Sequence, residues 1–440
     1  MSVKPLSKLS YLTAALRPRF FGFFQGHAAL KQDELDAIHH LVEKDADSVL
    51  ERKFEDNFAR LTGGEAVSFA ACRMAFYAVL QALGIGKGDE VLLTGFTCSV
   101  MPNAVWRTGA TPRYADISAD TLGTDPAAVA RKITNKTRAI VLQHTFGLPC
   151  DVEAIAKIAQ TTGIPLIEDC ALTVGSSMNG QPVGSWGEAA IFSTDHSKPL
   201  NTITGGLLVT QNRSLVNRVR EIQTAALSLP VEQRRRLWKR LLLERRNLSP
   251  GNYGRGRLAI KAVGGLRKVR QRFNKREEFT LLEGDFKPRI KPDSYPYPAR
   301  MPVFLAQVGL SQLAQWQETA AHRRSVLARL FEIASPELKK HFPAAYRDAK
   351  YDVVPLRLAY SHPRAHEIEQ RMRKYVDTDY IWFREPIVCA TAGPASFGYV
   401  TGDCPVAEHI GQNIINWPCD VPEKDVPALL KLFSECHRNL

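Results

Sequence analysis

The sequence lacks any apolar run long enough to cross a membrane. Its apolar stretches, such as residues 91–93 and 139–142, have the size of a strand, whereas a spanning helix needs about 20 residues. The basic, aromatic N-terminus, residues 1–24, also lacks a continuous apolar core followed by a small-residue cleavage site. We therefore expect no membrane span and no secretion signal, and we interpret the N-terminus as an ordered or docking arm.

The sequence also lacks paired cysteines. Its eight cysteines include no Cys-x-x-Cys pair, and no His/Cys spacing is suited to zinc. Internal repeats and low-complexity tracts are missing as well. We therefore expect no metal site, and we expect free thiols in the reducing cytoplasm.

Positive charge is concentrated in one segment. The formal net charge is +13, and residues 231–275 contain 15 Lys or Arg against 2 acidic residues. The remainder of the chain therefore has no net charge, which is typical of an ordinary enzyme-like body. Residues 231–275, called the basic insert below, therefore need a separate explanation for their charge.

Between residues 90 and 210, short β-branched runs alternate with helix-like stretches. Strands that are separated by crossover helices form a mostly parallel sheet that is buried on both faces. Ligands on such sheets bind beyond the carboxyl ends of the strands. We predict strands at residues 90–94, 112–116, 139–143, 165–169, 189–193 and 206–210, and helices at 99–108, 126–132 and 151–162.

The character of the chain changes after residue 210. A Pro-rich and Tyr-rich linker at 286–300 follows the basic insert, and residues 301–333 have the apolar spacing of one long helix or a pair of helices. The last third fits a small α+β domain. We divide the chain into an N-terminal arm with helices (1–57), a large domain (58–226), the basic insert and linker (227–296), and a long helix with the small C-terminal domain (297–440).

An acid at the end of one predicted strand and a lysine beyond a later one are the most informative residues. Pyridoxal phosphate (PLP) needs a lysine for covalent attachment and a carboxylate on its ring nitrogen, and Lys198 and Asp169 could supply them. The Ser193 hydroxyl and the helix N-terminal amides of the turn at residues 70–74, before an apolar helix, could bind the phosphate. Each residue alone would more commonly be a surface residue or a cap.

The strings around these residues resemble the DegT/DnrJ/EryC1/StrS family of PLP-dependent sugar aminotransferases, which have fold type I. Lys198 stands five residues after Ser193, and Gly205-Gly206 follows at the spacing of the family. The resemblance covers residues 58–210 and 297–430. Further matching strings are residues 82–91, 103–104, 109–112, 143–147, 167–169, 192–193, 382–383, 398–399 and 404–408.

The resemblance implies roles for single residues. Lys198 would hold the cofactor and Asp169 its ring nitrogen, while Ser193, Cys72 and Arg73 would bind the phosphate. Three positions depart from the family, because Leu172 replaces a glutamine, Cys98 replaces the aromatic residue that stacks on the ring, and residues 298–301 read Pro-Ala-Arg-Met. The remaining implied site residues are Arg300, in a segment that family dimers contribute to the neighbouring site, and His196, which would shape the site.

The resemblance implies amino transfer from a donor such as glutamate to a keto-sugar, which we expect to be a nucleotide-linked precursor of a surface glycan. A homodimer is also implied. One branch of the family dehydrates sugars and has a histidine at the lysine position, so Lys198 favours aminotransfer. The alternatives are such a dehydratase and a regulatory member that binds anions or nucleic acid.

The basic insert has three interpretations. Its aromatic residues are not interleaved as in a nucleic-acid platform, so we do not expect a nucleic-acid partner. A solvated appendage is the commonest fate of such a charge run. Residues 234–246 also resemble a basic amphipathic helix, which suggests peripheral contact of residues 231–275 with an anionic inner membrane face. The apolar residues of that helix are Leu237, Trp238, Leu241 and Leu242.

Overall fold

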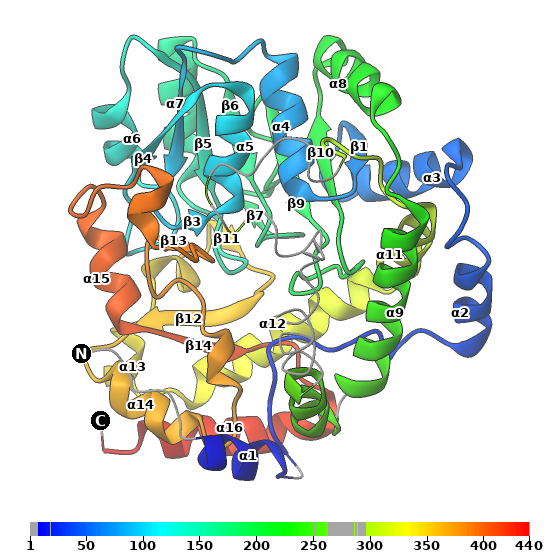
Figure 1. Cartoon of the computed structure of the whole chain (residues 1–440). Coiled ribbons are helices and arrows are strands. Elements are labelled where there is room, and N and C mark those ends of the chain that lie inside the picture. The colour runs from blue at the N-terminus through cyan, green and yellow to red at the C-terminus, as the bar shows by residue number, and fades with distance from the viewer. Residues whose placement is uncertain are drawn as a thin grey trace.

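The structure is a computed structural model that describes residues 8–17, 19–249, 251–262, 286, 288 and 296–439. Its centre is a seven-stranded sheet with the order β1-β10-β9-β6-β5-β2-β4 (Figure 1). The strands β9, β6, β5, β2 and β4 are parallel, whereas β10 is antiparallel to both of its neighbours. The strands are β1 (Glu65–Phe69), β2 (Glu90–Thr94), β4 (Thr111–Ala115), β5 (Thr137–Gln143), β6 (Leu166–Asp169), β9 (Ala189–Ser193) and β10 (Gly206–Thr210).

The prediction of a mostly parallel sheet that is buried on both faces is confirmed. Because side chains alternate along a strand, Val91 and Leu93 of β2 pack into one part of the core and Leu92 into the other. Both faces are covered by helices, so the strands read as continuous apolar runs. The covering helices are α4 (Cys72–Ala82), α5 (Val100–Thr108) and α8 (Arg213–Ala225) on one face and α6 (Pro126–Lys132) and α7 (Val152–Thr162) on the other.

Most predicted elements of this sheet region have bounds within two residues of the observed ones. Asp151, the first residue of the predicted helix 151–162, is the N-cap of α7, because its carboxylate accepts a hydrogen bond from Ala154 N at 3.4 Å. Strand β1 was not predicted.

The chain beyond residue 300 forms a helix pair and a smaller α+β region. The helices α11 (Val303–Ala314) and α12 (Trp316–Ile333) meet at Gln315. Of the two predictions for residues 301–333, the pair of helices is therefore confirmed and the single long helix is wrong. Antiparallel strands β12 and β14 form a two-stranded sheet. This region contains α13 (Pro336–Lys339), β12 (Arg357–Ser361), α14 (Ala365–Met372), α15 (Pro405–Asn413), β14 (Ile414–Pro418) and α16 (Val426–His437). The four domain boundaries remain predictions.

Short strands connect the two regions. The strands β7 (Ser177–Met178), β8 (Gln181–Pro182) and β11 (Tyr351–Asp352) form a three-stranded sheet, and β3 (Thr97–Cys98) pairs in parallel with β13 (Ile387–Val388). The remaining helices are α1 (Lys8–Ala15), α2 (Gln32–His39), α3 (Ser48–Ala59) and α9 (Val231–Asn247), and residues 253–262 are also helical. Segments from both halves of the chain therefore meet at the carboxyl end of the large sheet.

The described part of the basic insert packs against the body of the protein. Helix α9 buries Leu237 and Leu241, and Trp238 contacts His39 of α2 and Phe304 of α11. Of the four apolar residues that suggested a membrane helix, Leu242 alone is exposed, at 39%. The interpretation of this helix as an interfacial membrane helix is therefore corrected, because its apolar side lies in the protein core. Within the described ranges, no helix combines the length and apolar character that a membrane crossing requires.

Several basic residues in the described part of the insert are paired with acidic residues of the same chain. Arg240 Nε lies 2.6 Å from Glu244 Oε1, and Glu244 is fully buried. These contacts also distinguish the described part of the insert from a solvated appendage. The insert residues with acidic partners include Arg234 with Asp45, Arg235 with Glu43, Arg257 with Asp377 and Lys261 with Asp379.

The N-terminal arm lies between the insert and the small region. Gly26 crosses α9 so closely that an added Cβ would lie 2.3 Å from Glu244 O. Phe21 N donates to Tyr375 O at 2.7 Å, and Asp377 N donates to Phe21 O at 2.9 Å. The described residues of the arm are thus ordered by backbone contacts on two sides, in agreement with a docking arm.

Candidate active site

The loop between β9 and β10 carries Lys198 and is closed by its own hydrogen bonds. Thr194 N donates to Gly205 O at 3.1 Å, and Thr202 N donates to Thr194 O at 2.8 Å. At the tip, Lys198 N donates to Asp195 O at 2.9 Å. These backbone hydrogen bonds therefore fix the position of the Lys198 backbone, and the Lys198 side chain is half-buried.

Asp169 ends β6 in the middle of the sheet, between β5 and β9. Its carbonyl accepts from His144 N at 3.1 Å, and its Oδ1 accepts from Ala171 N at 2.9 Å. Burial raises the pKa of the Asp169 carboxyl, although the Ala171 amide and the charge of Lys198 act in the opposite direction. A positive group beside Asp169 would therefore stabilise its ionised form.

The N-terminus of α4 lies against the start of β10. A Cβ on Gly206 would lie 2.2 Å from Cys72 Cα, so only glycine permits this contact. The N-cap residue Ala71 makes no side-chain capping hydrogen bond, and Ser193 lies opposite Gly206 in the sheet. The first-turn amides of Cys72 and Arg73 and the Ser193 hydroxyl therefore lie near one corner of the sheet, as a phosphate site requires.

Several of the predicted site residues form one electrostatic cluster. Burial and the charge of Asp169 raise the pKa of the Cys72 thiol, whereas Lys198 lowers it. A hydrogen bond from Cys389 lowers the pKa of Cys98 to about 7, and Lys198 contributes in the same direction. The fold thus brings Lys198, Asp169, Cys72 and Cys98 together from separate segments. Their roles toward a cofactor remain predictions.

Trp382 also belongs to this cluster, although sequence reasoning gave it no role. Lys198 Nζ lies 4.8 Å from the centroid of the Trp382 ring. Trp382 N donates to Asn416 Oδ1 at 2.8 Å, which ties it to β14. The match of residues 382–383 to the family was a signal for this position, but only the folded chain shows that the indole contacts the lysine.

His196 is held by its neighbour in the loop. Its Nδ1 lies 3.0 Å from Asp195 Oδ1. Burial opposes a charge on His196, but the Asp195 carboxylate outweighs it and raises the pKa of the imidazole. The ring also meets Phe24 edge-on at a centroid distance of 5.6 Å. His196 thus joins the lysine loop to the N-terminal arm, and its role in shaping the substrate site remains a prediction.

Arg300 is paired within its own chain. Its Nη2 lies 2.8 Å from Glu51 Oε2 on α3, and its backbone N donates to Leu227 O at 3.0 Å. The same segment packs on the start of α4, where Tyr297 Oη donates to Arg73 O at 2.9 Å. The predicted reach of Arg300 into a second subunit is not tested by these contacts and remains a prediction.

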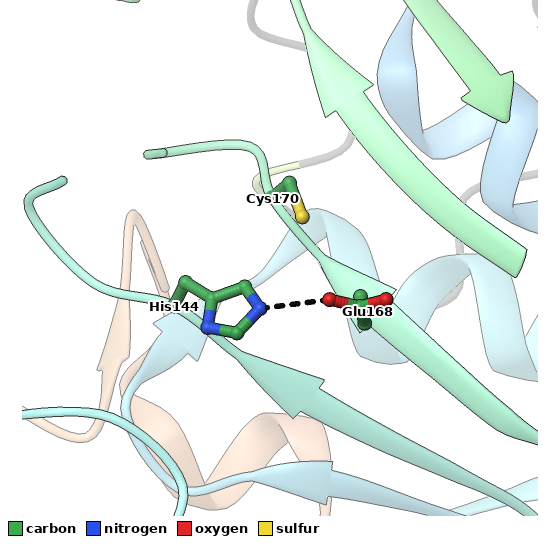
Figure 2. Close-up of side chains that lie close together, drawn as sticks. All are labelled: His144, Glu168 and Cys170. Atoms are coloured by element: carbon green, nitrogen blue, oxygen red, sulfur yellow. Dashed lines mark hydrogen bonds and ion pairs between the residues drawn. The ribbon is translucent and has the colours of Figure 1, made fainter. Parts of the chain in front are cut away.

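A buried cluster of possible metal ligands lies on the other side of β6. Figure 2 shows the His144 ring facing the Glu168 carboxylate, with Cys170 on the chain just beyond the strand that carries Glu168, and His144 Nε2 lies 3.1 Å from Glu168 Oε2. His144 Nδ1 accepts from Cys150 N, and Glu168 accepts from three amides of residues 184–187. Both imidazole nitrogens and both carboxylate oxygens are thus used inside the protein. We interpret this cluster as a support for the strand that carries Asp169.

Comparison with known proteins identifies the family. Residues 34–425 match the model of the DegT/DnrJ/EryC1/StrS aminotransferase family. The chain belongs to this family. The match includes every predicted site residue, and the resemblance that the sequence motifs indicated is confirmed.

Two curated relatives match part of the chain. The spore coat polysaccharide biosynthesis protein SpsC of Bacillus subtilis (strain 168) is 37% identical over 178 residues, which are 40% of this chain and 46% of the relative. The GDP-perosamine synthase of Escherichia coli O157:H7 is 38% identical over 168 residues, which are 38% of this chain and 46% of the relative. The matched segment thus spans less than half the length of these relatives.

A solved structure matches almost the whole chain. It is S. venezuelae DesV in complex with a ketimine intermediate, with a TM-score of 0.69 and 22% sequence identity. The match covers 96% of this chain and 100% of the DesV chain. This likeness shows the fold. The predicted architecture, a fold-type-I PLP transferase with a large mostly parallel sheet and a small α+β part, is confirmed.

Proposed function

We propose that this protein is a PLP-dependent aminotransferase that converts the keto group of a sugar to an amino group. The observation that carries the proposal is the shared site of Lys198 and Asp169 beyond the carboxyl ends of the parallel strands. A reactive amine and a buried carboxylate are the protein groups that PLP chemistry requires. Membership in an aminotransferase family supports the same reaction.

The residues present fit PLP in two further respects. The close contact of Gly206 with Cys72 brings the start of α4 to the site, and a helix N-terminus attracts a phosphate. Burial raises the pKa of Asp169, so a protonated ring nitrogen would favour its ionised form. When bound, PLP supplies a conjugated ring that accepts electrons from the substrate carbon.

The residues of the chain then have separate tasks. The Lys198 amine holds the cofactor before reaction and moves a proton at the substrate carbon. Asp169 keeps the ring nitrogen protonated. The Ser193 hydroxyl and the amides at the start of α4 orient the phosphate, and the Trp382 ring shields Lys198 Nζ from water on one side.

For the substrate, we propose a nucleotide-linked keto-sugar, with an amino acid such as glutamate as the donor. The relative named GDP-perosamine synthase supports a nucleotide-linked product, and the relative from spore coat polysaccharide biosynthesis supports a glycan precursor. The lysine at position 198 favours amino transfer over dehydration.

We further propose a homodimer that works in the cytoplasm. Arg300 would reach the site of the partner subunit, although its side chain also pairs with Glu51. Contact of the insert with an anionic membrane would rest on exposed charge, because Leu237 and Leu241 lie in the core.

An absorbance titration tests the function. Protein reconstituted with PLP should show a bound-cofactor band that shifts when glutamate is added, because the donor displaces the lysine. The Lys198→Ala variant should bind less cofactor and show no lysine-linked band. An unchanged spectrum of the loaded wild-type protein across a panel of amino-acid donors would contradict the proposal.

A further inference from the structure

Cys98 and Cys389 meet at the edge of the proposed cofactor site. Cys98 ends β3 and Cys389 follows β13, and these strands pair with Val388 opposite Cys98. Ser99 fixes the register, because its N donates to Val388 O at 3.0 Å and its Oγ donates to Cys389 O at 3.2 Å. The two thiols lie close enough for each to shift the pKa of the other. Segments of the large and the small region thus place two thiols side by side.

The backbone of Cys389 has an uncommon conformation that favours this contact. Successive side chains of a strand point to opposite faces, so a residue after Val388 in regular β geometry would point away from the face of Cys98. Cys389 instead has φ +62°, in the left-handed region that non-glycine residues rarely adopt. Such outliers are concentrated at functional sites, where the surroundings hold them in place.

These two thiols also differ from most other cysteines of the chain in their access to solvent. Cys389 is exposed and Cys98 is half-buried, whereas five of the other six are buried. The neighbouring Cys389 lowers the pKa of Cys98, which favours the thiolate form of Cys98. Burial instead raises the pKa of Cys150 and Cys170 well above the usual value.

We propose that Cys98 and Cys389 form a reversible disulfide that inactivates the site beside Lys198. Hydrogen peroxide serves as the oxidant. The Cys98 thiolate attacks one peroxide oxygen, the O–O bond breaks, and the leaving hydroxide takes a proton to become water. The Cys389 sulfur then attacks the Cys98 sulfenic acid, the S–S bond forms, and the hydroxyl leaves as a second water. The two thiols lose two electrons and the peroxide gains them, and a dithiol reductant reverses the change.

The disulfide would change a wall of the site. The charge of Lys198 acts on both thiols, so both lie within electrostatic range of its amine. A covalent bond would fix β13 to β3 and remove the Cys98 thiolate from this wall. We therefore expect the oxidised protein to load less cofactor and to turn over at least tenfold more slowly. These two effects rest on the proposed function, whereas the cross-link does not.

The test treats the full-length, PLP-reconstituted protein with a small molar excess of hydrogen peroxide. Alkylation and peptide mapping without reductant should identify one peptide pair joined through Cys98 and Cys389, and the protein should lose the mass of two hydrogen atoms. Cofactor absorbance and turnover should fall together, and dithiothreitol should restore both.

Two variants separate the thiol pair from general oxidation. The cofactor absorbance and turnover of Cys389→Ser should be the same before and after peroxide treatment, whereas Cys436→Ala, at a buried cysteine of α16, should lose both as the wild type does. Absence of the link between residues 98 and 389, or a link that leaves cofactor absorbance unchanged, would overturn the proposal. Because the link is read by mass, a failed amino-transfer assay would count against the proposed function alone.

Discussion

Arg357 stacks on Trp382, with its Cζ 3.9 Å from the centroid of the indole ring, and the same ring lies 4.8 Å from Lys198 Nζ. Arg357 is fully buried on β12, and desolvation lowers its pKa to about 9. Its Nη1 also donates to Asn416 Oδ1 at 3.2 Å, the atom that accepts from Trp382 N. The small region therefore holds the aromatic surface against which the lysine lies.

Lys198→Ala should fold but should form no covalent bond with PLP, because Lys198 is, among the lysines that the structure describes, the one whose charge acts on Asp169. Borohydride reduction followed by peptide mapping checks this outcome. Lys340→Ala, at an exposed lysine that pairs with Glu337, is the matched control and should label like the wild type. A pyridoxyl group on another lysine of the wild-type protein would show the assignment to be wrong.

Asp169→Asn, a nearly isosteric change, should retain the fold and lose about 1,000-fold in kcat. An amide cannot keep the ring nitrogen protonated, so the electron-accepting state of the cofactor is lost. Stopped-flow turnover and circular dichroism measure the two properties separately. Asp125→Asn, at a helix cap where Asn serves equally well, should keep full activity. Full activity of Asp169→Asn would remove this residue from the site.

Mixed dimers test the role of Arg300. If Arg300 acts across the dimer, inactive Lys198→Ala mixed with inactive Arg300→Ala should regain partial activity, because each hybrid contains one intact site. The Glu51→Gln variant breaks the ion pair within the chain but keeps Arg300. The activity of this variant therefore distinguishes the pairing of Arg300 with Glu51 from a role of Arg300 in the neighbouring site. No recovery after demonstrated subunit exchange would mean that Arg300 serves its own chain.

Adjacent leucines of α9 test whether the insert is part of the folded body. Leu241 is fully buried and Leu242 is 39% exposed. Leu241→Ala should destabilise the protein by about 2 to 5 kcal/mol, whereas Leu242→Ala should change the unfolding free energy by less than about 0.5 kcal/mol. Urea denaturation of both variants gives the comparison. Equal, small effects would indicate an insert that does not share the core.

His27 should make stability depend on pH between 4 and 6.5. Burial lowers its pKa from 6.5 to about 4, against an opposing effect of Glu244. The unfolded chain therefore binds more protons in this window, and stability falls as the pH falls, by on the order of 3 kcal/mol at most. The difference in unfolding free energy between wild type and His27→Gln should change across the window. His366→Gln, at an exposed histidine, should show no such change.

Local sequence pattern was sufficient for most of the large domain. Strands β2, β9 and β10 have the predicted bounds, because buried parallel strands are continuous apolar runs and helix caps such as Asp151 have a local signature. The same locality explains why Lys198 and Asp169 could be selected together, since Asp169 is the last residue of β6 and Lys198 stands five residues after the end of β9.

The basic insert shows where this reasoning was wrong. The sequence shows that a helix has a charged face and an apolar face. It does not show whether the apolar face is covered by a membrane or by the rest of the protein. In α9 the apolar face is covered by α2 and α11, and partners such as Asp377 lie more than a hundred residues away.

The sequence by itself determined the alternation of strands and helices, the family and the pair of Lys198 and Asp169, because these depend on periodicity and on short motifs. Only the tertiary structure placed Trp382 against Lys198, Cys389 against Cys98 and the insert against the core. These contacts join residues that are distant in sequence. Their geometry depends on how two regions pack, and no local spacing specifies that packing.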